Sequence, residues 1–195
     1  SVVAQNIRSG QSYSFQGKWF ADCTGDGSVG FLSGADYAIT TNGHMGRSNL
    51  WFVSDTGVAT EFPNLPWALD LTEHRVPDPS QKISGWYWES GYEHDPFAKG
   101  EYIRDWNFRA AYGTWDKVKN VEKRYATHAI KWMAYISGKR ESRRLMGDYI
   151  LNRTDLALSV KYDDGCVPLS WSMDTHHPDS RYVKGFEGDA FIAQC

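Results

Sequence analysis

Short alternating patterns of hydrophobic and polar residues dominate the beginning of the chain. Residues 1–6 have the character of an extended strand, residues 8–10 supply a turn, and Tyr13 and Phe15 alternate with polar residues on the return. Residues 19–22 follow a Gly-Lys turn and predict a third strand. This pattern indicates a small antiparallel sheet at the start of the chain.

Apolar runs and a proline-containing connection follow. Residues 50–53 form a short apolar run and residues 83–89 an aromatic one, and both predict strands. Between them, residues 61–80 contain four prolines, which break regular structure and predict a long irregular connection. Connections of this length are often functional. Residues 40–47 are polar and predict a loop.

The clearest helical pattern lies in the second half of the chain. From Thr114 onward, apolar residues fall on one stripe at helical spacing, and Gly138 stands where a helix C-terminus favours a left-handed residue. The stripe consists of Val118, Val121, Tyr125, Trp132 and Ile136. Residues 101–112 predict a second helix, which ends near Gly113.

The last predicted elements are short. Residues 140–151 look extended, Thr154 with Asp155 predicts the cap of a short helix, and residues 163–165 form a turn. Together the elements predict an α+β fold with a small antiparallel sheet and a helical lobe.

Composition narrows the function classes. The 195 residues contain 41% hydrophobic and 23% charged residues, so an ordinary folded core is expected. A net charge of −3 argues against nucleic acid as the main partner, and no apolar run is long enough to span a membrane. Cys23, Cys166 and Cys195 are too few and too dispersed for a disulfide scaffold or a zinc site.

Aromatic residues are unusually frequent, with nine Trp, eleven Tyr and nine Phe. Trp67 and residues 86–88 can stack on sugars or flavins, although most aromatic side chains fill cores. Carboxylate pairs such as Glu89 and Glu93 are of a kind that glycosidases use. A carbohydrate-binding or carbohydrate-active module is therefore one open hypothesis.

The segment Thr24-Gly-Asp-Gly27 is the strongest candidate for ligand binding. It ends a short apolar run and precedes a small-residue segment that could begin a helix. Glycine permits close approach of another group, and amides at a helix start favour negative charge. Thr24, Gly25, Asp26 and Gly27 are the predicted cofactor-binding residues. A glycine-rich surface turn without a ligand is the plainer interpretation.

A second interpretation of the same glycines is a dinucleotide-binding fingerprint. Gly25, Gly27 and Gly30 satisfy the pattern G-x-G-x-x-G, and Asp55 could be the acidic residue after the next strand. Such a unit needs a buried parallel strand before the glycines, and Lys18 makes the preceding segment a poor candidate for one.

Four cations gather around one carboxylate in the arginine segment, residues 139–144. If this segment is extended, Arg140 and Arg144 share one face, while Glu141 and Arg143 share the other. Arginine can clamp a carboxylate or phosphate bidentately, so Arg140 and Arg144 are candidate substrate contacts. A solvated run of charge is the alternative.

A pair of histidines flanked by acids is the other candidate for chemistry. His176, held by Asp174 or Asp179, could move a proton near neutral pH. Adjacent histidines in an extended segment point to opposite faces, so His177 would not share a metal with His176. We expect no metal site, and exposed loop histidines are the alternative.

Several of these segments, in this order, are together similar to one family. Asp22-Cys-Thr-Gly-Asp-Gly27, Trp115-Asp-Lys-Val-Lys-Asn120, Gly138-Lys-Arg-Glu-Ser-Arg-Arg-Leu-Met-Gly-Asp-Tyr149 and Ser172-Met-Asp-Thr-His176 resemble motifs of a family of FAD-dependent oxidoreductases. Some of its members carry the label xanthan lyase, an activity that no residue pattern here indicates.

The resemblance implies a flavoenzyme fragment. Family members open with a strand and a G-x-G-x-x-G and close with an Ala-Gly-Arg-Asn segment, and this chain neither opens nor closes in this way. Residues 1–40 would then be the exit of the nucleotide-binding domain of a larger FAD-binding α/β protein, and residues 41–195 its cap or substrate lobe. The expected partners are FAD, bound weakly or not at all by the fragment alone, a small-molecule substrate with a sugar-derived compound as one candidate, and the remainder of the flavoprotein chain.

Overall fold

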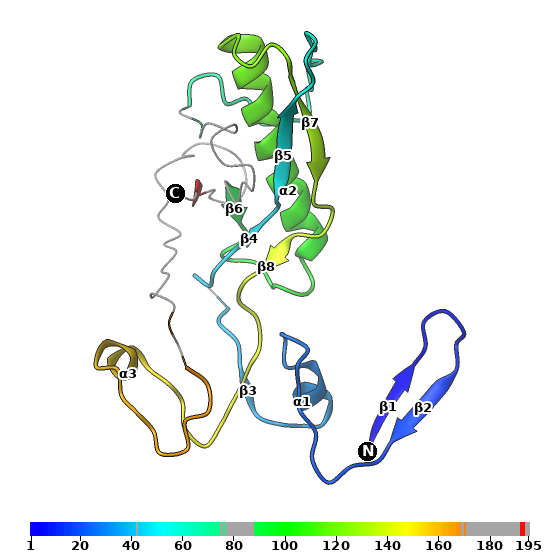
Figure 1. Cartoon of the computed structure of the whole chain (residues 1–195), viewed down its shortest axis with the longest axis vertical. Helices are drawn as coiled ribbons and strands as arrows, with labels where there is room; N and C mark the ends of the chain where they lie inside the picture. Colours follow the sequence, from blue (N-terminus) through cyan, green and yellow to red (C-terminus); the bar gives the residue numbers. More distant parts are fainter. Residues whose placement is uncertain (42, 75, 77–87, 169, 171–191, 194–195) are drawn as a thin grey trace. The chain divides into compact units, whose positions relative to one another are not determined.

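A computed structural model shows a mixed α+β chain, as predicted, with small antiparallel sheets and few helices (Figure 1). It describes residues 1–41, 43–74, 76, 88–168, 170 and 192–193. The chain divides into two compact units. Unit 1 comprises Ser1–Ala38 and Arg143–Leu158, and unit 2 comprises Ile39–Ser142 and Ser159–Cys195.

Unit 1 begins with the predicted hairpin. Strands β1 (Val2–Gln5) and β2 (Ser12–Phe15) pair antiparallel, with Val2 opposite Phe15. The side chain of Asn6 accepts the amides of the turn that joins the strands. The predicted third strand at residues 19–22 is wrong: these residues form no strand, and Trp19 is 91% exposed. A strand needs a neighbour to receive its hydrogen bonds, and this segment follows the hairpin without joining it.

The rest of unit 1 joins two distant parts of the sequence. Helix α1 (Ser28–Leu32) follows residues 24–27, and strand β3 (Tyr37–Ala38) pairs antiparallel with β9 (Arg144–Leu145). Helix α3 (Arg153–Ala157) forms where a short helix was predicted. Its cap is Asn152 instead of Thr154, because Asn152 and Asp155 complete a reciprocal capping box.

Unit 2 contains a sheet of four short antiparallel strands in the order β10-β6-β4-β8. These are β10 (Ile192–Ala193), β6 (Trp88–Ser90), β4 (Arg47–Ser48) and β8 (Gly138–Lys139). Strand β6 confirms the end of the strand predicted over residues 83–89, of which residues 83–87 lie outside the described residues.

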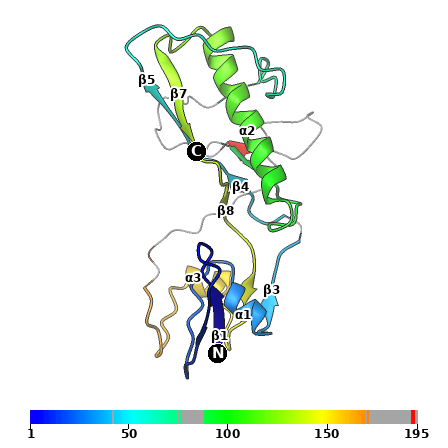
Figure 2. The ribbon, with the colours of Figure 1, turned by 90° about the vertical axis from the view of Figure 1, so that its right-hand side faces the viewer.

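A two-stranded sheet lies beside the long helix of unit 2 (Figure 2). Strand β5 (Trp51–Asp55) confirms the predicted apolar strand and pairs antiparallel with β7 (His128–Met133). Helix α2 (Gly100–Asp116) continues into a π-helical turn, η1 (Lys117–Val121). None of the helices that the structure describes is both long and apolar enough to cross a membrane.

The helix predicted from Thr114 to Ile136 is wrong beyond Val121. Lys123 and Tyr125 take left-handed backbone conformations that end the helix, and the chain then returns as β7. Trp132 and Ile136, assigned to the apolar stripe, are 52% and 80% exposed. Backbone pairing with β5 therefore outweighs the helical spacing of the apolar residues in this segment.

Gly113 lies inside α2 instead of ending it. A Cβ atom at Gly113 would collide with the backbone carbonyl oxygen of Leu69, whose amide donates to the carbonyl of Arg109 at 3.0 Å. The glycine therefore lets the irregular connection lie directly against the helix. Around this contact packs the core of unit 2, formed by Trp51, Val53, Leu69, Leu71, Trp88, Trp106, Ala110, Ala111, Trp115 and Val118.

Candidate functional site

The carboxylate of Asp22 organises the glycine turn, residues 24–27. Its Oδ1 accepts the amide and the hydroxyl of Thr24 at 3.0 and 2.7 Å, and its Oδ2 accepts the amide of Gly30 at 2.8 Å. These hydrogen bonds, that from Gly30 foremost, lower the pKa of Asp22 to about 2. The Thr24 hydroxyl accepts the amide of Ser28 at 2.8 Å. Two amides at the start of α1 are therefore used by the chain itself.

The glycines of this region serve two different purposes. Gly25 has a φ of 78°, and a Cβ atom there would meet nothing within 4 Å, so its side of the turn is open. A Cβ at Gly27 would lie 3.0 Å from the Leu145 side chain, and one at Gly30 would collide with it. Close approach at Gly27 and Gly30 thus accommodates Leu145, and Gly25 is the position left open to a ligand.

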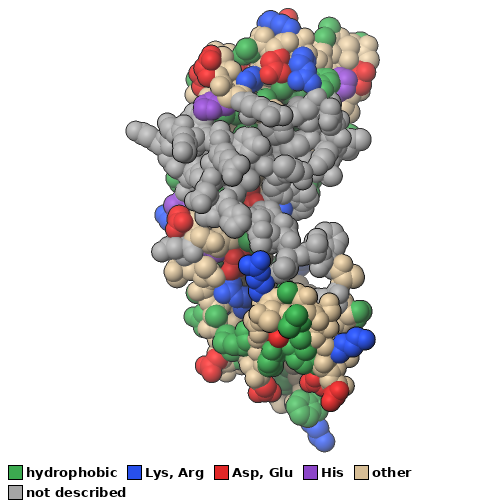
Figure 3. All heavy atoms as spheres, turned by 90° about the vertical axis from the view of Figure 1, so that its left-hand side faces the viewer, with side chains coloured by type: hydrophobic (Ala, Val, Ile, Leu, Met, Phe, Trp, Pro, Cys, Tyr) green, Lys and Arg blue, Asp and Glu red, His purple; other side chains and the backbone are tan. Residues whose placement is uncertain are grey.

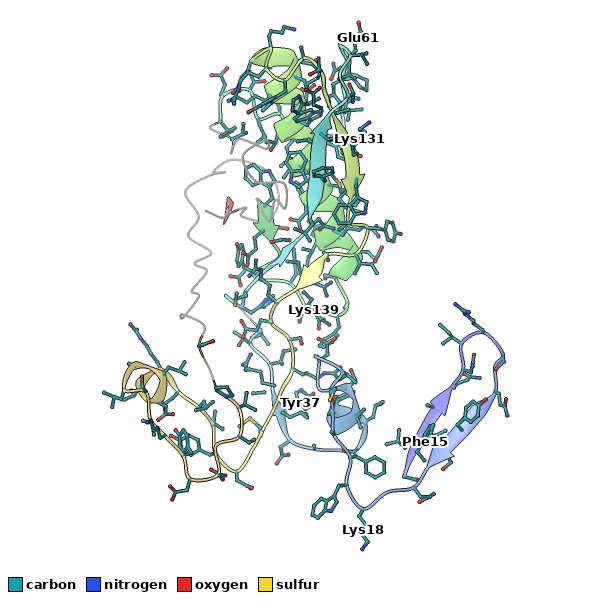
Figure 4. All side chains as sticks on the ribbon, viewed as in Figure 1. Phe15, Lys18, Tyr37, Glu61, Lys131 and Lys139 are labelled. Atoms are coloured by element: carbon teal, nitrogen blue, oxygen red, sulfur yellow. The ribbon has the colours of Figure 1, made fainter. Side chains whose placement is uncertain are left out.

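Arg143 joins the arginine segment to the glycine turn. Its Nε donates to the carbonyl oxygen of Asp26 at 3.1 Å, and its guanidinium lies over the ring of Phe31 at 4.1 Å. Phe31 in turn meets the edge of Tyr37, which Figure 4 labels, at a ring distance of 5.3 Å. The sequence pattern singled out the neighbours of Arg143 and missed this residue, because only the tertiary structure brings the turn to it.

The two predicted arginines belong to different units. Arg144 lies in β9 of unit 1, opposite Ala38, and is exposed. Arg140 lies in unit 2, near the buried phenol of Tyr92. His176, the third predicted catalytic residue, lies outside the described residues.

A buried polar cluster occupies the sheet of unit 2. Glu89 in β6 is fully buried, and its Oε1 accepts the amide of Gly46 at 2.8 Å. Tyr92 is 2% exposed, and within the described part of the chain its hydroxyl has no hydrogen-bond partner. Burial and then the charge of Glu89 raise the pKa of Tyr92, while Arg140 acts in the opposite direction. Tyr92 is therefore a neutral phenol, on whose pKa an acid and a cation act in opposite directions.

Glu141, the carboxylate of the arginine segment, is also structural within unit 2. Its two oxygens accept the Thr40 hydroxyl at 2.8 Å and the Met45 amide at 2.9 Å. The neighbouring imidazole of His44 lies with its two nitrogens 2.8 and 2.7 Å from the carbonyl oxygens of Met45 and His94. The segment predicted to be a solvated run or a substrate clamp thus anchors a loop through its acid.

Other predicted arrangements are not formed by the described residues. The segment before the glycine turn forms no strand, and Asp55 ends a strand that is antiparallel to β7, so these residues do not form a dinucleotide-binding unit. Glu89 is buried while Glu93 is exposed. The described residues contain no group of three side chains that could hold a metal ion.

Comparison with known families identifies the class of protein. Residues 72–192, more than half of the chain, match the model of the family described as FAD dependent oxidoreductase. The chain therefore belongs to this family. No curated protein matches the chain significantly. No solved structure matches it significantly either.

Proposed function

We propose that this chain is part of a flavin-dependent oxidoreductase, in which residues 1–40 supply the exit of the nucleotide-binding domain and residues 41–195 the cap or substrate lobe. The family match over residues 72–192 carries this proposal. The glycine turn adds support from outside the matched residues. It lies in unit 1 and resembles a motif of the same family.

The glycine turn fits a flavin nucleotide on one side only. The amides of Ser28 and Gly30 are already used by Thr24 and Asp22, so the start of α1 offers no cradle for a phosphate. The side of Gly25 is open, and the adjacent Asp26 has its backbone carbonyl held by Arg143. We therefore assign FAD contact to the Gly25 side of residues 24–27, with Asp22 and Arg143 holding the turn in shape.

FAD, when bound, would accept two electrons from the substrate. The chain's own part is to hold the substrate and to move its proton. We assign anion binding, or pairing with a buried acid, to Arg140 and Arg144. Arg140 and the buried Glu89 both act on the pKa of Tyr92, which favours the buried acid for Arg140. His176, oriented by Asp174, is the proposed proton carrier.

The remainder of the flavoprotein chain is the proposed partner of unit 1. Large apolar side chains are exposed on this unit, and Figure 3 draws such hydrophobic side chains in green. Ile7 is 98% exposed, Trp19 91% and Leu158 71%. Exposed apolar surface of this kind is typical of a contact with further protein.

The test is flavin loading of the full-length protein that contains this chain. Gly25→Val should abolish the flavin absorbance of the purified protein, because valine blocks the open side of the turn and strains its backbone. Gly10→Val is the matched control, since Gly10 also has a positive φ, of 74°, and open space around it, but lies in the β1–β2 hairpin. Equal loading in both variants would remove the glycine turn from the flavin site.

The role of His176 needs its own comparison. With a substrate in hand, His176→Ala should lower turnover by roughly 100-fold, and His177→Ala should lower it much less. A larger loss in the His177 variant, or no loss in either, would overturn the assignment.

A further inference from the structure

The outer face of α2 carries a depression that the flavin proposal does not use. It has a volume of about 460 Å³ and is lined by Trp67, Asp105, Phe108 and Arg109. Trp67 belongs to the irregular connection between β5 and β6, and the other three residues belong to α2. The volume falls within the range of small-molecule sites, roughly 300–1,000 Å³.

The aromatic wall of the depression is exposed yet held in place. The Trp67 side chain is 46% exposed, and its ring lies 5.0 Å from that of Tyr112, which supports it from α2. The backbone carbonyl of Trp67 accepts the Nε of Arg109 at 2.9 Å. This hydrogen bond pins the connection to the helix, so the indole forms a fixed platform.

The two charged groups of the depression are also oriented before any ligand arrives. The guanidinium of Arg109 lies over the ring of Trp106 at 4.2 Å, and Asp105 Oδ1 accepts two nitrogens of Arg104 at 2.9 and 2.7 Å. Within the described part of the chain, Arg109 uses only its Nε and Asp105 only its Oδ1 in hydrogen bonds. The terminal nitrogens of Arg109 and the Oδ2 of Asp105 thus remain for a ligand.

The combination of these groups selects a ligand class. One carboxylate and one guanidinium face the same depression, and Arg104 pairs with both Asp105 and Glu101 beside it. The two arginines and two carboxylates sum to zero charge, so the depression attracts neither an anion nor a cation strongly. A purely apolar ligand would displace the water around both charged groups without offering hydrogen bonds in its place, which costs free energy. A sugar ring satisfies each element, because its C–H face stacks on an indole while its hydroxyls donate to a carboxylate and accept from a guanidinium.

We propose that the depression formed by Trp67, Asp105, Phe108 and Arg109 binds a neutral saccharide, with Trp67 as the stacking platform. This site is independent of the flavin and is testable without it. The site gives this chain a surface that binds a polyhydroxylated compound. It also gives a role to the long irregular connection, which positions the exposed Trp67.

The experiment is a calorimetric titration of the purified protein with cellotetraose and with maltotetraose. Saturable binding of at least one is expected at concentrations up to about 10 mM, a range that covers weak millimolar affinity. Trp67→Ala should weaken it about tenfold or more, and Asp105→Asn should weaken it while leaving the platform intact. Trp132→Ala is the matched control, since this tryptophan is 52% exposed on β7 of the same unit.

Three results would overturn the proposal. The first is that neither oligosaccharide binds. The second is that Trp67→Ala and Asp105→Asn, with circular dichroism spectra equal to wild type, both bind as well as wild type. The third is that tetragalacturonate, an anionic saccharide, binds while both neutral ones do not, which would assign the depression to an anion.

Discussion

Arg143 donates its Nε to the backbone carbonyl oxygen of Asp26 at 3.1 Å, across a sequence separation of 117 residues. The same guanidinium lies over Phe31, at the end of the turn and helix that Asp22 organises. Leu145, two residues further on, fills the space that Gly27 and Gly30 leave free. Two motifs that are far apart in the sequence therefore form one piece of structure within unit 1.

Replacing Arg143 should loosen this piece of structure. Arg143→Lys keeps the charge but removes the Nε donor and the planar surface over Phe31, and we expect unit 1 to lose about 1 kcal/mol of stability. Hydrogen exchange of the amides at residues 24–32 should report the loss as faster exchange. Arg153→Lys, at an exposed position on α3, is the control. Unchanged exchange in the Arg143 variant would contradict the proposed contact.

Acid should release the glycine turn in a defined window. The pKa of Asp22 is lowered from 3.8 to about 2, so its ionised form is favoured in the folded state. The stabilisation is complete above pH 3.8 and is lost as the pH falls towards 2.

Asp22→Asn tests this assignment. The asparagine side chain has a single oxygen and cannot accept from both Thr24 and Gly30 as the carboxylate does. Hydrogen exchange at the Gly30 amide should therefore be fast at neutral pH. Between pH 4 and about 2 it should change only as the intrinsic exchange rate changes. Asp148→Asn, at an exposed position of the same unit, should keep the wild-type pH profile. Protection of Gly30 that survives in Asp22→Asn would be inconsistent with the carboxylate as its acceptor.

Lys119 should be a stabilising residue of unit 2 and not a catalytic one. It is 8% exposed, burial lowers its pKa, and its Nζ lies within 3.1 Å of the Thr60 hydroxyl and of the carbonyl oxygens of Tyr125, Ala126 and His128. Lys119→Met would remove a charged donor that all four oxygens share, although the carbonyl oxygens of Tyr125, Ala126 and His128 also accept from the amides of His128 and Thr60 and from the Thr60 hydroxyl. We expect the free energy of unfolding to fall by about 2 kcal/mol.

Chemical denaturation measures this loss. Lys131→Met is the control, because Lys131, labelled in Figure 4, is exposed on β7. A similar denaturation midpoint for both variants would show that the donors which remain satisfy these oxygens without Lys119.

Gly113→Ala should destabilise the protein. In an exposed helix interior the same substitution stabilises the helix by about 1 kcal/mol. Here the new Cβ would collide with the carbonyl oxygen of Leu69, so Gly113→Ala should lower the melting temperature. A raised melting temperature would mean that the irregular connection moves away from α2 at little cost.

The sequence by itself determined the elements that rest on local chemistry. The β1–β2 hairpin follows from alternation around an Asn turn, and the helix at residues 153–157 follows from a capping pattern only two residues from its predicted position. The α+β class and the family also came from the sequence, and the match over residues 72–192 confirms the family. The hairpin and the capped helix depend on interactions between residues a few positions apart, which can be predicted from the order of residues alone.

The tertiary structure decided what depends on distant partners. Residues 128–133 have helical spacing but form β7, because β5 offers them backbone hydrogen bonds from 70 or more positions away. Gly27, Gly30 and Gly113 look like ligand or turn positions, yet they face Leu145 and Leu69. Trp67 was visible as an aromatic residue, but its exposed ring beside Asp105 and Arg109 was not. A sequence lists which groups are available, and only packing determines which of them meet, because contact energies outweigh local preferences of about 1 kcal/mol.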